Sequence, residues 1–104
     1  MIELNWHYCL DSEQLVQNKI TEVDADGKAV CLLRRNEVLN AFAATCPHAG
    51  GRLCDGWTDA QGRVVCPLHK YRFNPANGYN TSGEGYKLKT YLVKEEEGRI
   101  FVQY

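Results

Sequence analysis

Two short peptides, each pairing a cysteine with a histidine, place the strongest constraint on how this chain can fold. They are Cys46-Pro47-His48 and Cys66-Pro67-Leu68-His69, and seventeen residues separate them. Thiolate ligands suit iron–sulfur clusters or zinc, and imidazole suits iron, zinc or copper. In each peptide a proline fixes φ directly after the cysteine, which predicts a tight loop. The fold must therefore bring two loops together around a metal centre, with Cys46, His48, Cys66 and His69 as candidate ligands.

Two sulfur and two nitrogen ligands fit two kinds of centre. In a 2Fe–2S cluster, replacing two thiolates by neutral imidazoles removes negative charge and raises the potential to roughly −150 to +300 mV. A structural zinc ion accepts the same four ligands in a closed tetrahedron. Zinc modules, however, place paired ligands within small ββα or ribbon units, whereas each peptide here carries one ligand of each kind. The spacing favours the cluster, and Gly50-Gly51 would let the backbone pass close to it.

The rest of the chain predicts an all-β domain, either a small sandwich or a partly open barrel. Strands are expected at residues 6–10, 18–23, 28–34, 37–45, 63–66, 71–74, 87–94 and 99–104. Turns are expected at 24–27, 35–36, 75–78 and 95–98, and one helical turn at 11–16. Residues 45–85 hold seven of the nine glycines and all three prolines, so we interpret this segment as the functional insertion on a β scaffold.

Composition narrows the class of protein. A chain of 104 residues is one domain, here residues 1–104. Its 12 basic and 13 acidic residues argue against nucleic-acid binding. No apolar run approaches the roughly 18 residues of a membrane span, and the N-terminus has no signal-peptide pattern. We therefore expect a cytoplasmic protein with no membrane or nucleic-acid partner.

The five cysteines favour free thiols, because an odd number does not suit a disulfide scaffold and a reducing compartment keeps thiols free. Cys31 lies in a continuous apolar run, and Cys9 lies in the first expected strand, so both are predicted to be small core residues. Cys54 lies between the two ligand peptides. Its role stays open between a loop thiol and a substitute ligand.

Residues 45–53 and 62–69 resemble the two cluster loops of Rieske ferredoxins. The segment 71–74, the Asn77-Gly78 turn and the final hairpin fit the same family. The resemblance implies a Rieske-like fold with a cluster-binding loop subdomain at about residues 45–85 and one 2Fe–2S cluster per chain. It further implies that Cys46 and Cys66 bind the inner iron, while His48 and His69 bind the outer iron near the surface, where electrons would leave.

The chain departs from the Rieske proteins of cytochrome bc complexes at several positions. Gly51 and Leu68 stand where those proteins carry two disulfide-forming cysteines, so that disulfide is impossible. Tyr71 and Phe73 replace a serine and a tyrosine whose hydroxyls donate to the cluster sulfurs. Fewer donors stabilise the reduced state less, which predicts a potential low in the family's range. Lys70 replaces a glycine, for which the sequence offers no reason.

These features predict a soluble one-electron carrier rather than an enzyme. It would pass electrons from a reductase to an oxygenase or another acceptor within a multi-protein oxidoreductase system. An oxygenase site would need two further histidines, and only His7 remains uncommitted. Two alternatives stay open: a small electron-transfer subunit of a nitrite-reductase-like complex, and a zinc-stabilised interaction module.

Charges around the loops raise the question of partner docking. Arg52, Arg63, Lys70 and Arg72 lie in or beside the ligand peptides, and the acidic run 95–97 lies in another hairpin. If the two loops converge, these basic residues would lie at the end of the molecule that holds the 2Fe–2S cluster. They would then steer the protein toward an acidic partner surface. The alternative is scattered, solvated charge, and the acidic run is expected to be a solvated hairpin tip.

Overall fold

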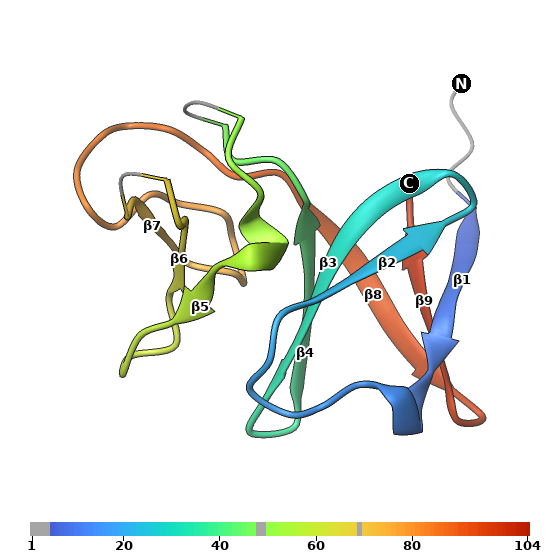
Figure 1. The fold of residues 1–104 in the computed structure, drawn as a ribbon. Helices are drawn as coiled ribbons and strands as arrows, with labels where there is room; N and C mark the ends of the chain where they lie inside the picture. Colours follow the sequence, from blue (N-terminus) through green and yellow to red (C-terminus); the bar gives the residue numbers. More distant parts are fainter. Residues whose placement is uncertain (1–4, 48–49, 69) are drawn as a thin grey trace.

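The computed structural model describes residues 5–47, 50–68 and 70–104, and it divides into a large and a small antiparallel sheet (Figure 1). The large sheet has the strand order β1-β9-β8-β4-β3-β2, and we call it the scaffold. Its strands are β1 (Trp6–Asp11), β2 (Thr21–Ala25), β3 (Lys28–Arg35), β4 (Val38–Ala43), β8 (Thr90–Glu96) and β9 (Arg99–Gln103).

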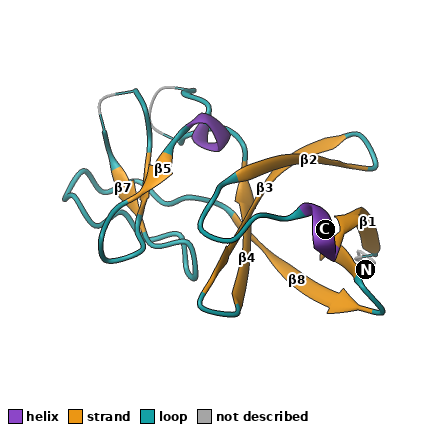
Figure 2. Ribbon diagram, turned by 60° about the horizontal axis from the view of Figure 1, so that its bottom comes forward, coloured by secondary structure: helices purple, strands orange, loops and turns teal. Residues whose placement is uncertain are grey.

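The small sheet lies between β4 and β8 in the sequence and stands at one end of the scaffold (Figure 2). It consists of β5 (Trp57–Thr58), β6 (Val64–Val65) and β7 (Arg72–Phe73). Together with the 3-10 helix η2 (Leu53–Asp55) and the connecting loops, it forms what we call the loop subdomain. A second 3-10 helix, η1 (Ser12–Gln14), follows β1 in the scaffold.

The scaffold curls until its two edge strands, β1 and β2, approach each other. His7 on β1 has its Nδ1 2.6 Å from the Asp26 carboxylate at the end of β2. Tyr104 follows β9, and its hydroxyl donates to the Ala25 carbonyl of β2 at 2.5 Å. These contacts nearly close the sheet, which confirms the all-β, partly open barrel that the sequence predicted.

Strand β3 explains why the apolar run in the sequence is continuous rather than alternating. All four residues 30–33 are buried, but neighbouring side chains in a strand point to opposite faces. Val30 and Leu32 pack into the scaffold core, while Cys31 and Leu33 pack against the loop subdomain. A strand that is covered on both faces has no polar side. The scaffold core packs on one face of β3, and the loop subdomain packs on the other.

The three scaffold hairpins turn through two residues each, and the sequence placed all three turns imprecisely: the one expected at 24–27 is shorter, because Asp24 and Ala25 belong to β2. Asp26-Gly27, Asn36-Glu37 and Glu97-Gly98 all have positive φ, as the tight turns that match strand twist require. The expected Arg35-Asn36 turn is therefore wrong by one residue, because Arg35 pairs with Val38 inside the ladder. The expected turn at 95–98 is shorter for the same reason, since Glu95 and Glu96 belong to β8.

Other boundaries also differ from the sequence expectations. The strand expected at 18–23 begins at Thr21, because Asn18 takes a left-handed φ of 66°. The strand expected at 87–94 begins at Thr90, and Leu88 is buried in the loop subdomain instead. The short strand β5 was not expected. The helical turn at 11–16 is confirmed as η1, and the Asp11 backbone N–H donates to Gln14 Oε1 at 3.0 Å.

In the part of the chain that the structure describes, no helix has the length and apolar character that crossing a membrane requires.

Candidate metal centre

The first candidate loop runs from Cys46 to Gly51 and begins three residues after the end of β4. The Cys46 N–H donates to the Gly51 carbonyl at 2.7 Å, and the Gly50 N–H donates back to the Cys46 carbonyl at 3.1 Å. Just outside the loop, Thr45 and Arg52 form an antiparallel bridge. The loop is thus closed at its base by backbone hydrogen bonds, with the cysteine at the first position.

The second candidate loop has the same construction. It begins at Cys66, directly after β6, and the Cys66 N–H donates to the Tyr71 carbonyl at 2.8 Å, just before β7. The loop therefore spans 66–71 as the tip of a β6–β7 hairpin, and the first loop spans 46–51. Each cysteine is held by the backbone at the entry of a six-residue loop.

The two loops meet at Gly51. A Cβ at this position would lie 2.9 Å from Cys66 Sγ and 3.0 Å from the Leu68 Cβ, so only glycine lets the loops approach this closely. Gly50 is different, since a Cβ there would meet nothing within 4 Å, and its φ of +74° is what requires glycine. The expectation that this glycine pair lets the backbone pass close to a cluster stays a prediction; the close approach seen at Gly51 is to Cys66 and Leu68 of the second loop.

Cys46 and Cys66 are buried side by side, and neither forms a disulfide. Burial raises the pKa of the Cys66 thiol to about 11, partly opposed by a hydrogen bond from the Leu68 backbone N–H and reinforced by the Cys46 thiol beside it. Two adjacent buried thiols ionise only where a cation compensates the charge, which is the environment of a metal site. The two cysteines therefore fit a metal centre that takes two sulfur ligands from this pair.

The other two predicted ligands, His48 and His69, lie outside the described residues. Within 5–47, 50–68 and 70–104, no three side chains of the histidine, cysteine or carboxylate type gather around a common metal position. The structure thus brings together half of the predicted ligand set, the two cysteines.

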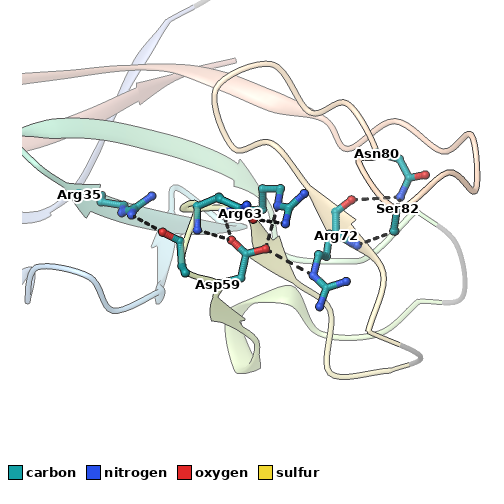
Figure 3. A network of polar contacts seen from close by, with 8 residues as sticks. Arg35, Asp59, Arg63, Arg72, Asn80 and Ser82 are labelled. Atoms are coloured by element: carbon teal, nitrogen blue, oxygen red, sulfur yellow. Dashed lines mark hydrogen bonds and ion pairs between the residues drawn. The ribbon is translucent and has the colours of Figure 1, made fainter.

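A carboxylate, Asp59, fastens the strands that carry the second loop (Figure 3). Its Oδ1 accepts from the backbone N–H groups of Gln61 and Arg63, both at 3.0 Å, and its Oδ2 accepts from Arg63 Nε at 2.8 Å. Arg72 Nε, on β7, lies 3.4 Å from the same Oδ2. Burial opposes ionisation of this carboxyl, but the hydrogen bonds from Arg63 and Gln61 outweigh it and hold the pKa of Asp59 below its usual range.

The hydrogen-bond network around Asp59 extends to the scaffold on one side and to the residues around Arg72 on the other. The Arg35 guanidinium, at the end of β3, donates to the Ala60 carbonyl at 3.2 Å and so links the scaffold to this loop. The Arg72 backbone N–H donates to Ser82 Oγ at 3.0 Å, and Asn80 Nδ2 donates to the Arg72 carbonyl at 3.1 Å. Sequence analysis missed Asp59, since an isolated aspartate before a Gln-Gly pair reads as an ordinary turn residue.

The basic residues expected around the two loops are largely neutralised by ion pairs with carboxylates. Arg52 pairs with Glu22 of β2 and, at 3.2 Å, with Asp55. Arg63 and Arg72 share Asp59, as described above. This pairing favours the alternative of dispersed charge over a strong steering field. The acidic run is also not wholly solvated, because Glu95 forms an ion pair of 2.8 Å with Arg34, whose guanidinium lowers the pKa of that carboxyl.

Two cysteine expectations need correction. Cys31 is buried, as predicted, but it is not a free thiol: it forms a disulfide with Cys54, with the two Cα atoms 5.5 Å apart. Cys54 is therefore neither a loop thiol nor a substitute ligand. The pairing depends on β3 turning Cys31 toward the loop subdomain, which the sequence could not reveal for two cysteines at a separation of 23. Cys9 is free and half-buried at a bulge of β1, where it packs against the scaffold core.

Lys70 and Phe73 account for two of the noted departures. Lys70 has a φ of +60°, the left-handed region that glycine adopts without strain, which explains why glycine is usual there. Phe73 is fully buried in the apolar cluster beneath the loops, and its ring offers no hydroxyl. Tyr71 is partly buried in the same cluster and stacks on Tyr86 with the ring centroids 5.9 Å apart.

A curled antiparallel sheet carries two loops at one end, each headed by a buried cysteine, so the fold is a small β domain with a candidate sulfur-ligated metal centre. The chain belongs to the Rieske [2Fe-2S] domain family, whose model matches residues 5–92. Its cofactor is therefore a 2Fe–2S cluster, as the sequence predicted.

Among curated proteins, the chain is 33% identical to cholesterol 7-desaturase nvd of Drosophila melanogaster over 95% of this chain and 25% of that protein. It is 29% identical to the ferredoxin subunit of methanesulfonate monooxygenase of Methylosulfonomonas methylovora, over 93% of this chain and 79% of that subunit. The chain thus spans about a quarter of the length of the desaturase relatives and most of the ferredoxin subunit.

Two solved structures match nearly end to end. The ferredoxin of carbazole 1,9a-dioxygenase from Nocardioides aromaticivorans IC177 has 27% identity and a TM-score of 0.86, with 94% of this chain and 96% of that chain covered. A nitrite reductase small subunit from Mycobacterium tuberculosis has 23% identity and a TM-score of 0.86, with 99% and 97% covered. The second likeness concerns the fold alone.

Proposed function

We propose that this protein is a one-electron carrier of the Rieske ferredoxin type. One observation supports this most directly: two buried cysteines outside any disulfide lie side by side, each at the start of a six-residue loop, in a chain of this family. The proteins that match this chain over most of their own length include two ferredoxins and a nitrite reductase small subunit. An oxidoreductase step on a substrate would then belong to a partner, not to this chain.

The proposed ligands are Cys46 and Cys66 for one iron and His48 and His69 for the other. When bound, the cluster supplies a reversible one-electron couple. The chain's own residues set its surroundings. The Leu68 N–H donates to the Cys66 sulfur, and apolar side chains such as Phe42 and Phe73 exclude water beneath the loops. Because Phe73 adds no hydroxyl donor, we propose a midpoint potential in the lower part of the family's range.

The proposed partners are redox proteins that dock at the loop end: a reductase that donates the electron, and an oxygenase that accepts it. Support comes from the two ferredoxins above, whose names assign them to a monooxygenase and a dioxygenase system. Leu68, in the second loop, keeps 39% of its surface exposed and offers an apolar contact beside Cys66. Given the paired arginines, we expect the electron-transfer rate to depend weakly on ionic strength.

The second candidate function is a small electron-transfer subunit of a nitrite-reductase-like complex, which the fold of such a subunit supports. The two functions differ in their acceptor. Purified reduced protein offered in turn to an oxygenase component and to a sirohaem reductase subunit would separate them, because only the physiological acceptor oxidises it at a catalytic rate.

The central test is reductive titration of aerobically purified protein, followed by EPR and metal analysis. The proposal expects a visible spectrum, an EPR signal on reduction and two irons per chain. Cys46→Ser and Cys66→Ser should each abolish the signal, while Cys9→Ser, in the scaffold, should keep it. A colourless protein with one zinc per chain would establish the zinc module instead.

A cytoplasmic location remains part of the proposal. It is supported by the need to keep the two ligand cysteines as thiols until metal binds. The Cys31–Cys54 disulfide is the observation that weighs against it. Fractionation of the native host, followed by detection of the protein in each fraction, tests the location.

A further inference from the structure

The disulfide Cys31–Cys54 joins the two parts of the molecule covalently. Cys31 lies in the middle of β3, in the scaffold, and Cys54 lies in η2, in the loop subdomain. The backbone otherwise connects the two parts only where the chain leaves β4 and where it enters β8 (Figure 1). The disulfide is thus a third covalent connection: it joins Cys54, which lies between these crossings in the sequence, to Cys31, which lies before both.

This connection lies close to the metal-binding cysteines. Both disulfide cysteines belong to the same buried apolar cluster as Cys46 and Cys66. Cys54 also follows the first loop by three residues, and the intervening Leu53 N–H donates to the Ala44 carbonyl at 2.8 Å, across the base of that loop. A movement of η2 away from β3 would therefore pull on the base of the loop that carries Cys46.

An ion pair, which also links the flank of the first loop to the scaffold, is much weaker. Arg52 pairs with Glu22, which lies opposite Cys31 in the β2–β3 ladder. The Arg52 side chain is 58% exposed, and an exposed ion pair contributes little to stability. The disulfide is therefore the strong attachment of the first loop, and the ion pair beside it is the weak one.

We propose that Cys31–Cys54 is a redox-sensitive tether that controls how firmly the chain retains its cluster. Cleavage breaks one S–S bond and forms two S–H bonds, which requires two electrons and two protons. A dithiol reductant supplies both and becomes a disulfide itself. The cluster proposed above carries one electron, so it cannot complete this reduction alone. The tether's effect on retention depends on the proposed cluster function, although its existence does not.

The burial of the two sulfurs determines how the reductant reaches them. Cys31 is fully buried, whereas Cys54 keeps 9% of its surface. An attacking thiolate is therefore expected to approach from the Cys54 side, and attack at that sulfur displaces Cys31 as the leaving thiolate. Because access is narrow, reduction is slow in the folded protein and accelerates when the loop subdomain opens.

Thiol counting tests whether the tether exists. The purified protein is quenched in trichloroacetic acid, which expels cluster sulfide and stops thiol exchange, and is then alkylated under denaturing conditions with a maleimide that adds a fixed mass per thiol. Of the five cysteines, three are free in the structure, so we expect three additions without reductant and five after reduction. Five additions without reductant would overturn the proposal, whether or not a cluster is present.

Cluster release tests whether the tether matters. The loss of visible absorbance is followed with an excess of iron chelator, with and without dithiothreitol, in the wild type, in C31S/C54S and in C9S. We expect dithiothreitol to accelerate release from the wild type and from C9S by about tenfold or more, because cleavage frees a closed loop. The double variant should release its cluster fast in both conditions. The melting temperature of the wild type should fall by about 10 °C on reduction.

The retention role would be refuted if dithiothreitol reduces all five cysteines of the wild type but does not change the rate at which the cluster is released. This comparison needs no variant, so it holds even if C31S/C54S fails to fold. C9S controls for a general effect of removing a thiol, since Cys9 is free and lies in the scaffold. A protein with three free thiols but no cluster spectrum would refute the proposed function while leaving the disulfide established.

Discussion

The two cysteine loops share one construction but are fastened in different ways. Both begin at a buried cysteine whose N–H closes a six-residue span. The first loop is anchored outward, to the scaffold, through the Cys31–Cys54 disulfide and the Arg52–Glu22 pair. The second loop is anchored inward, within the small sheet, through the carboxylate of Asp59.

This difference shows how two loops can hold one centre without a direct covalent clamp between them. The first loop takes its position from β3. The second takes its position from its own hairpin and from the contact of Gly51 with Cys66. Because Gly51 and Leu68 remove the loop-to-loop disulfide of the cytochrome bc type, the spacing between the loops depends on packing at Gly51.

The largest expected effect is therefore at the meeting point of the loops. Gly51→Ala would place a methyl group 2.9 Å from Cys66 Sγ, and overpacking of this kind costs about 1–3 kcal/mol. We expect most of the bound iron to be lost, as measured by iron per chain and visible absorbance. Gly50→Ala is the matched control: it meets no atom within 4 Å, so it should keep the iron and lose only about 1 kcal/mol from its left-handed φ. Equal iron in both variants would show that the loops adjust freely.

Next comes the internal fastening of the second loop. Asp59→Asn should lower the free energy of unfolding by about 2 kcal/mol, because charged hydrogen bonds to Arg63 weaken and two guanidinium groups lose their counter-charge. Asp55→Asn removes a carboxylate that is 63% exposed and should cost less than about 0.5 kcal/mol. Denaturant unfolding of both variants gives the comparison, and similar losses would mean that Asp59 has no special role.

The stability difference between wild type and D59N should depend on pH. The pKa of Asp59 is lower in the folded chain than the usual value of about 3.9, so the folded state favours its ionised form. Its contribution is complete above the unfolded pKa and is lost as the pH falls through the lower folded pKa. Melting temperatures measured from pH 7 downward should converge below about pH 4. A difference that stays constant through this range would assign the effect to packing instead of charge.

A smaller effect, of opposite sign, is expected at Lys70. Lys70→Gly should stabilise the chain by about 1 kcal/mol, because glycine adopts the φ of +60° without steric cost. Lys70→Ala removes the charge but keeps the strained backbone, so it should give no gain. Thermal unfolding distinguishes the two, and equal shifts would point to the lysine charge as the cause.

The smallest effect is expected for the exposed link of the first loop. Glu22→Gln should change the free energy of unfolding by no more than about 0.5 kcal/mol, since its partner Arg52 is well exposed. A larger loss in denaturant unfolding would mean that the ion pair, and not only the disulfide, anchors this loop.

The sequence by itself determined the class of fold, the segment that carries the site and the family. The spacing of the two ligand peptides, their prolines and the glycine-rich stretch were sufficient for these, because they specify local loop geometry and ligand chemistry. Most strands were also predicted, since alternation and turn residues act over a few neighbours. The exact turns, such as Asn36-Glu37, were decided by the ladder register, which depends on the partner strand.

Only the tertiary structure decided what depends on distant residues. Cys31 looked like a core residue in an apolar run, and the side of β3 on which it lies makes it the partner of Cys54. Asp59 looked like a turn residue until the hairpin brought Arg63 and Arg72 to the same carboxylate. Lys70 was unexplained until its positive φ was known. In each case a local pattern was readable, but the contact that gives it meaning forms only when separate segments meet.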